Sequence, residues 1–320
     1  MLGFYLKKIL ALLATLFSLS VILFLTFYWI PGDPALIMLG PSASQEAIDQ
    51  IHEEIGYDQA IWDQYRHNIG SYFSTSKPLL SYRLHRPVRE LIHERLGLSL
   101  SLMLLALVWI LLISLPLALL ATYHAGRFLD RAIGLSMRLF LSLPAFLMAL
   151  FLALFFSFVL HWYRPGQSLS PVRDLIPYLK ALLLPSLAVA LPRAAQAYQF
   201  LRSALEHAGR QDFVKTARAK GASRRRILLR HVLRNALVPY VTAISLVLSE
   251  LILGTLVVEQ VFSLPGLGQL LFMSVAQRDF PLAQSLLLCL AVSIVSINTL
   301  ADLINISIDP RLRRTKEIFS

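Results

Sequence analysis

Long apolar stretches alternate with polar segments along the 320-residue chain. Six such stretches run over 9–30, 96–123, 139–160, 181–201, 237–258 and 282–304. Each is about as long as the 20 residues that an α-helix needs to cross the hydrocarbon core of a bilayer. No strand-rich stretch and no strong internal repeat separates them. The pattern therefore predicts an all-α integral membrane protein with six spanning helices.

The polar segments between these stretches differ in character. The first, 31–95, holds nine acidic and six basic residues, a balance of −3, and within it 44–55 has a helical pattern that Ser44 is suited to cap. We predict a small extracytoplasmic subdomain over 31–95. Segment 259–268 contains a proline and two glycines, which break a helix. We expect a short helix or a re-entrant turn there.

Basic residues gather in one segment late in the chain. From 202 to 234 there are ten Lys and Arg against two acidic residues, a balance of +8. Because an excess of Lys and Arg marks cytoplasmic loops, this segment and both termini are predicted to be cytoplasmic. The expected division is a first transmembrane helix over 1–30, the subdomain over 31–95, a five-helix core over 96–307 with a cytoplasmic loop over 202–236, and a cytoplasmic tail over 308–320.

Composition supports a membrane protein and limits its chemistry. Charged residues make up 15% of the chain, against about 25% in soluble proteins. The net charge of +11 would suit a nucleic-acid partner, but the basic segment carries no series of interleaved aromatic residues for base stacking, so we expect none. The single cysteine, Cys289, excludes an internal disulfide, and no metal-binding motif occurs.

Segment 212–221 is predicted to form a short helix with two different faces. On a helical wheel, Phe213, Val214, Ala217 and Gly221 fall on one side, and mostly cationic residues fall on the other. The small residues make a flat strip that another backbone can approach closely. The alternative interpretation is a basic loop that only fixes the orientation of the chain in the membrane.

Two charged residues fall inside predicted spans. Glu250 lies near the middle of the fifth and Arg193 within the fourth. A charge at that depth costs a few kcal/mol, so both are expected to face the bundle interior, a translocation pathway or a subunit interface. Arg193 is a candidate counter-charge for Glu250. A pathway role for Glu250, facing a peptide amine or a cation, and a structural role at an interface both stay open.

The basic segment closely resembles a known loop. Residues 212–221, Ser223 and 230–239 resemble the cytoplasmic coupling loop, the "EAA" loop, of ABC-importer permeases of the dipeptide, oligopeptide and nickel branch. One departure is the stretch Lys215-Thr216-Ala217, which lacks the glutamate of the loop's name. Further resemblance to this branch lies at 31–34, 56–59, 258–262, 265–268 and 278–281, so it covers nearly the whole chain.

The resemblance implies a six-helix type I permease of the bacterial inner membrane that imports a solute by alternating access. It implies a second homologous permease subunit, most often in a heterodimer, two ATP-binding subunits and an extracytoplasmic solute-binding protein. The chain has no phosphate-binding loop, so ATP and Mg are expected on the partners, with no cofactor on this chain. The coupling residues implied by the resemblance are Asp212, Phe213, Thr216, Ala217, Lys220, Gly221, Arg230 and Asn235.

Three alternatives follow from the same sequence. Within the branch, the solute could be a peptide, nickel or a metal chelate. An ion-coupled secondary transporter would favour paired intramembrane carboxylates in repeated halves, of which only Glu250 is evident. An intramembrane enzyme would need a nucleophile and a base, or metal ligands, at membrane depth, and no such arrangement is evident.

Overall fold

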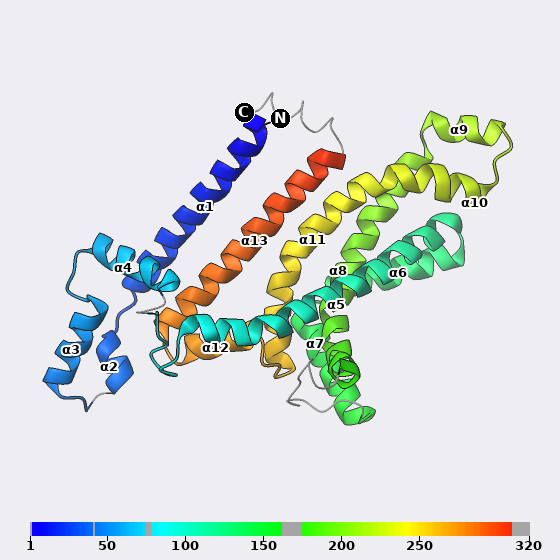
Figure 1. The fold of residues 1–320 in the computed structure, drawn as a ribbon. Helices are drawn as coiled ribbons and strands as arrows, with labels where there is room; N and C mark the ends of the chain where they lie inside the picture. The colour runs from blue at the N-terminus through cyan, green and yellow to red at the C-terminus, as the bar shows by residue number, and fades with distance from the viewer. Residues whose placement is uncertain (1, 41, 75–77, 162–174, 309–320) are drawn as a thin grey trace. The chain divides into compact units, whose positions relative to one another are not determined.

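A computed structural model describes residues 2–40, 42–74, 78–161 and 175–308. The helices in these ranges are α1 (Leu2–Tyr28), α2 (Pro34–Leu39), α3 (Gln45–Ile55), α4 (Ile61–Phe73), α5 (Val88–Tyr123), α6 (Phe128–Ser142), α7 (Ala145–Leu154), α8 (Leu175–Gly209), α9 (Asp212–Ala219), α10 (Arg224–Arg226), α11 (Leu233–Val261), α12 (Leu267–Ala276) and α13 (Phe280–Ile308). Two π-helical segments, η1 (Phe155–Val159) and η2 (Ile227–Val232), continue α7 and precede α11 (Figure 1). The predicted all-α class is confirmed. Residues 309–320 of the predicted tail, and 162–174 of the polar segment between the third and fourth apolar stretches, lie outside the described residues.

Five of the described helical stretches are long and apolar enough to cross a membrane, and a sixth crossing is made if a bent pair counts as one span. This pair, 128–142 and 145–159, is bent by 101°. The apolar stretch 139–160 was predicted to form one span, whereas helical structure begins at 128 and breaks within this stretch, between 142 and 145. The break falls at Leu143, whose ψ of 122° is extended. Proline disfavours a helical conformation of the residue before it, and Pro144 follows directly.

Other prolines do not break their helices. Pro116 lies within α5, Pro185 and Pro192 lie within α8, and Pro239 lies within α11. Packing against neighbouring helices keeps such a helix continuous although one backbone hydrogen bond is lost. Helices α5 and α8 also extend beyond the apolar stretches that predicted them, because their polar ends are helical too.

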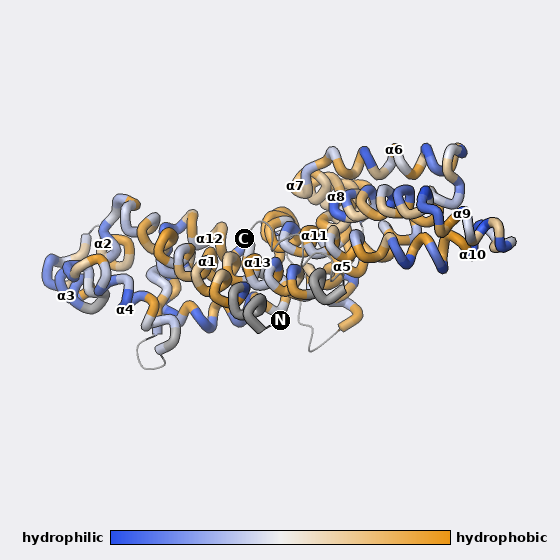
Figure 2. The backbone as a smooth tube through the Cα atoms, turned by 90° about the horizontal axis from the view of Figure 1, so that it is seen from above, coloured by the Kyte–Doolittle hydropathy of each residue, from blue (hydrophilic) through white to orange (hydrophobic). Residues whose placement is uncertain are grey.

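The chain divides into two compact units, which are described separately. The first comprises Met1–Ser99 with Pro265–Ser296, and the second Leu100–Leu264 with Ile297–Ser320. Hydrophilic residues gather on α3 and around α9 and α10, whereas hydrophobic residues run along the spanning helices (Figure 2). This distribution agrees with helices that face lipid and ends that face water.

In the first unit, the predicted helix at 44–55 is confirmed. Helix α3 begins after Ser44, whose side chain accepts a hydrogen bond from the backbone N–H of Ala47 and so caps the helix. Helix α2 begins in the same way: Asp33 Oδ1 accepts a hydrogen bond from the N–H of Ala35 at 2.8 Å. Capping therefore fixes the starts of both short helices.

A buried carboxylate joins the loop before α5 to the start of α13. Asp279 is 1% exposed and accepts hydrogen bonds from Ser81 Oγ, from Tyr82 N at 3.1 Å and from Leu282 N at 3.4 Å. These neutral donors replace water around its charge. Burial, and then the nearby Asp279 charge, raise the pKa of Tyr82 above its ordinary value.

The predicted break near 259–268 is present. Helix α11 ends at Val261, and α12 is a short apolar helix that begins at Leu267. The N–H of Leu267 donates a hydrogen bond to Ser99 Oγ at 2.9 Å, which satisfies one of the free N–H groups at the start of α12.

In the second unit, α8 and α11 pack along each other, and α6 and α7 both pack against α8 (Figure 1). A Cβ atom added to Gly254 would lie 3.3 Å from Val189 Cγ1, so the glycine permits a close approach of the two helices. Ser114 Oγ and the hydroxyl of Tyr240 lie 2.7 Å apart and join α5 to α11. This core holds the polar groups described next.

Candidate coupling site and intramembrane ion pair

Helix α9 forms where the sequence predicts a short polar helix. Its C-terminal end is a Schellman motif: the N–H of Ala222 donates to the carbonyl of Ala217 at 3.1 Å, and that of Gly221 donates to Arg218 at 3.0 Å. Gly221 has a φ of +75°, which glycine adopts without strain. A Cβ at this position would meet nothing within 4 Å. Gly221 thus ends the helix and leaves the surface beside it open.

The predicted apolar side of α9 divides into two parts. Val214 is 5% exposed and lies on a helix that packs against η2, so it is used within the chain. Phe213 and Ala217 are half-buried, whereas Thr216 and Gly221 are exposed. The helical wheel places Val214 on the same strip as Phe213 and Ala217, but in the structure Val214 alone of the three is buried.

The polar side of α9 faces water. Asp212 and Lys215 form an ion pair at 2.8 Å, with side chains that are 92% and 78% exposed. Lys220 is exposed as well. The hydroxyl of Thr216 donates to the carbonyl of Asp212 at 3.2 Å, which holds this side chain against its own helix.

The other two predicted coupling residues lie on the segment that packs against α9 and on the helix that follows it. Arg230, in η2, and Asn235, in the first turn of α11, are both exposed. Asn235 Nδ2 donates to the carbonyl of His231 at 2.8 Å. A π-helical turn is rare and occurs often at functional sites. The structure thus places Arg230 on the element against which α9 packs.

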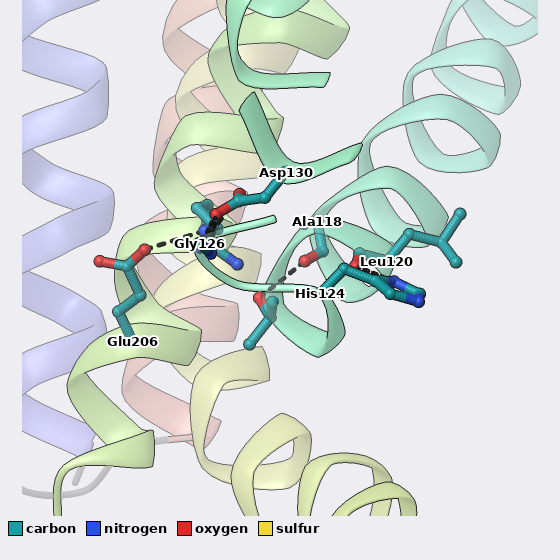
Figure 3. A network of polar contacts seen from close by, with 8 residues as sticks. Ala118, Leu120, His124, Gly126, Asp130 and Glu206 are labelled. Carbon is teal, nitrogen blue, oxygen red and sulfur yellow. Dashed lines mark hydrogen bonds and ion pairs between the residues drawn. The ribbon is translucent and has the colours of Figure 1, made fainter. Parts of the chain in front are cut away.

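A network that the sequence analysis did not single out lies at the end of α8 nearest α9 (Figure 3). Arg202 lies 3.2 Å from Asp130 on α6 and 2.9 Å from Glu206 on its own helix. Asp130 also accepts a hydrogen bond from the N–H of Gly126 at 2.9 Å. The network ties the α5–α6 turn to α8, about two turns before α9 begins. The spacing of Arg202 and Glu206, i and i+4 on a helix, was the available signal.

The two charged residues inside the spans are brought together. The guanidinium of Arg193 on α8 forms an ion pair with the carboxylate of Glu250 on α11, and it also donates to Gln196 Oε1 at 3.1 Å. In the isolated chain the Arg193 and Glu250 side chains are 29% and 40% exposed. One residue before Glu250, Ser249 Oγ donates to Asn298 Oδ1 on α13. Polar groups of three spanning helices therefore lie near one level of the unit.

The site combines charged groups and hydrogen-bonding groups at the ends of helices. Among the described residues, no group of three or more His, Cys, Asp or Glu side chains is arranged to hold a metal ion. The arrangement suits binding of a partner at α9 and transmission of its displacement to α8 and α11, which continue into the membrane.

The fold matches a solved importer. The chain aligns with an inward-facing structure of the MetNI methionine ABC transporter with a TM-score of 0.57 at 17% sequence identity, covering 69% of this chain and 97% of the other. A second crystal form of the same transporter gives a TM-score of 0.55 at 18% identity. These helices therefore have the fold of a type I ABC-importer permease.

Similar proteins and family models identify the family to which the chain belongs. Residues 114–314 match the family described as "Binding-protein-dependent transport system inner membrane component", and residues 1–103 match the family of its N-terminal region. A glutathione transport system permease protein of Shigella flexneri serotype 5b is 34% identical over 98% of this chain and 99% of its own length. A putative peptide transport system permease protein of Brucella abortus is 32% identical over 96% and 98%. The chain belongs to the family of binding-protein-dependent transport system inner membrane components, and it is a permease subunit rather than an enzyme by itself.

Proposed function

We propose that this chain conducts short peptides into the cell as one of two permease subunits in an ATP-driven importer. The similarity to glutathione and peptide permeases over almost the full length supports a peptide cargo over nickel or a metal chelate. The partner permease is a related, different chain. A solute-binding protein delivers the peptide to the subdomain over 31–95, outside the membrane, and both termini lie in the cytoplasm.

The observation that carries this proposal is the exposure of α9 beyond the ends of α8 and α11. Its Schellman turn leaves open space where a Cβ of Gly221 would stand, and the small residue Ala217 lies one turn earlier. One of the two ATP-binding subunits, which hold ATP and Mg, binds α9 through Phe213, Ala217 and Gly221. Asp212, Thr216, Lys220, Arg230 and Asn235 add polar contacts around this centre.

The mechanism we propose is alternating access. Closure of the ATP-binding subunits displaces α9, and because α9 packs against η2, which leads directly into α11, the displacement reaches the spanning helices. The Arg193–Glu250 pair joins α8 to α11 and lies along the translocation pathway. Its carboxylate and guanidinium offer opposite charges to the two ends of a peptide.

A pair of isosteric substitutions tests the coupling role. Asparagine and aspartate both tolerate the left-handed conformation of position 221, so Gly221→Asn and Gly221→Asp differ mainly in charge. We expect Gly221→Asn to retain most peptide uptake and Gly221→Asp to reduce peptide-stimulated ATP hydrolysis about tenfold, as expected for a loss of about 1.4 kcal/mol of binding. Uptake into proteoliposomes and copurification of the ATP-binding subunits measure both effects. Equal, wild-type activity of the two variants would remove Gly221 from the interface.

A further inference from the structure

The first unit contains a large cavity whose ligand nothing so far assigns. It has a volume of about 970 Å³, and its described lining comes from the end of α1, from α2, α3 and α4, from the loop before α5, and from the start of α13. Sites for small molecules typically measure about 300–1,000 Å³, so this one accommodates several residues of a peptide. Its described lining combines aromatic rings with side-chain amides and hydroxyls rather than being uniformly apolar.

The described residues give the lining of the cavity a negative charge. Among its described lining residues, Asp33 and His67 are the only acidic or basic side chains, and none is Lys or Arg. The Asp33 side chain is 27% exposed, and its Oδ1 lies 2.8 Å from His52 Nε2. Burial acts to raise the pKa of Asp33, but the hydrogen bonds from His52 and Ala35 outweigh it and hold the pKa below its usual value. The carboxylate is therefore ionised at neutral pH.

The polar side chains that line the cavity also include a hydrogen-bond acceptor that is available to a donor on a ligand. Asn68 Nδ2 on α4 donates to Gln284 Oε1 on α13 over a long 3.5 Å. Asn68 Oδ1 is buried and accepts no hydrogen bond from the described residues. A buried acceptor without a donor is costly, and a short rotation of this amide would present its oxygen to a ligand in the cavity.

Aromatic side chains are the third feature of the cavity. Tyr28 and Trp29 at the end of α1, and Tyr57, which stacks on His52 with ring centroids 4.4 Å apart, all line the cavity. The faces of such rings attract cations. A carboxylate, an unused acceptor and several aromatic faces together favour a primary ammonium group attached to an apolar or aromatic body.

We propose that this cavity binds the protonated N-terminal amine of a short peptide, with Asp33 as its counter-charge and Tyr28, Trp29 and Tyr57 around its first side chain. The inference rests on the proposed function, and it adds a binding station on this chain before the membrane pathway. Phosphatidylethanolamine carries the same primary ammonium group. We assign the site to a peptide because side-chain amides, which can pair with peptide groups, line it beside the ammonium subsite: Gln64, Asn68 and Gln284.

The test uses the complete importer, without its solute-binding protein, in nanodiscs made only of phosphatidylglycerol, so that no lipid amine is present. The probes are the tripeptide Ala-Phe-Ala and its N-acetylated form, which differ in the positive charge. We expect the free amine to bind about tenfold more tightly by calorimetry, the equivalent of about 1.4 kcal/mol. Adding phosphatidylethanolamine to the nanodiscs should leave the affinity unchanged.

Two matched variants locate the effect. Asp33→Asn keeps an N-cap for α2, since asparagine caps as well as aspartate, and removes the charge. We expect it to bind both probes equally. Asp49→Asn neutralises an exposed carboxylate of the same subdomain that does not line this cavity, and it should keep the tenfold preference.

Three results would overturn the inference: no preference in the wild type, an unchanged preference in Asp33→Asn, or competition by phosphatidylethanolamine. Peptide uptake into proteoliposomes, measured in parallel with the solute-binding protein present, separates this failure from a failure of the proposed function. Normal uptake without an amine preference would leave the proposed function standing and reject only the cavity site. Absent uptake in the wild type would reject the proposed function itself.

Discussion

Helix α9 and the spanning helices of the second unit carry similar charges in opposite surroundings. On α9, Asp212 and Lys215 are paired at 2.8 Å, and both side chains are more than three-quarters exposed. Between α8 and α11, Arg193 and Glu250 are paired as well, with 29% and 40% of their side chains exposed, at positions inside apolar spans. Water solvates the first pair, whereas the second lies between apolar spanning helices.

This difference decides what each pair can contribute. An exposed pair is typically worth about 0.2–1 kcal/mol, because water already stabilises both charges. A charge placed in the membrane costs several kcal/mol unless a partner compensates it. Once either Arg193 or Glu250 is present in the spans, the other is needed to compensate its charge. Asp212 and Lys215 do not depend on each other in this way, so both are available for contacts with a partner protein. Arg202, whose side chain is 15% exposed, is more buried than either pair, but it lies just beyond the apolar stretch 181–201.

The largest effect is expected from removing one charge of the intramembrane pair. Glu250→Leu leaves the Arg193 guanidinium uncompensated, which should destabilise the assembled importer by about 2–4 kcal/mol and abolish uptake. The double variant Arg193→Leu/Glu250→Leu removes both charges and should recover most of the stability. Thermal unfolding of the detergent-purified complex measures both changes.

Uptake by the double variant separates the two roles that the sequence left open for Glu250. Restored stability without uptake would assign the pair to the translocation pathway, and recovery of both would make it structural. If the importer with Glu250→Leu alone were as stable as the wild type, the intramembrane pair would behave like an exposed one. The proposed difference between the two ion pairs would then be refuted.

An intermediate effect is expected at the Arg202 network. Arg202→Met leaves Asp130 and Glu206 without their shared cation, and we expect a loss of about 1–2 kcal/mol, in the range for hydrogen bonds to charged groups. Asp130→Asn is the milder control, because its side-chain oxygen can still accept the hydrogen bond from Gly126. Hydrogen exchange of the α5–α6 turn should rise in Arg202→Met and change little in Asp130→Asn. Unchanged exchange in both would show that this turn does not depend on α8.

Sequence periodicity was sufficient for the elements whose signal is local. The lengths of the apolar stretches predict the spans, and the cap at Ser44 predicts the start of α3. The separation of apolar and polar residues onto two faces predicts α9. The bend between α6 and α7 was missed, because Pro144 breaks its helix whereas Pro116, Pro192 and Pro239 do not. That outcome depends on packing with neighbouring helices rather than on the proline itself.

The sites show the same division. The suggested partnership of Arg193 and Glu250, 57 residues apart in sequence, is present in the structure. This pairing could be predicted because each charge is the only one in its apolar stretch. The link between Arg202 and Asp130 could not be predicted, because both residues belong to segments rich in charge, where the sequence offers several equally good partners. The burial of Val214 could not be predicted either, because it depends on the position of η2. A helical wheel of α9 carries no information about neighbouring segments.

The smallest effect on stability is expected on α9 itself. Lys215→Gln removes an exposed ion pair, and we expect the free energy of unfolding of the chain to change by less than about 0.5 kcal/mol. Electrostatic contacts across an interface act mainly on the rate and salt dependence of association. If cations of α9 meet acidic groups of an ATP-binding subunit, Lys215→Gln should weaken retention of that subunit at low salt, and the difference from the wild type should vanish near 1 M salt, where charges are screened within about 3 Å. Retention on an affinity column across a salt series measures this directly. A loss of stability without a change in retention would place the function of Lys215 inside the fold, and the contrast between the two ion pairs would then no longer hold.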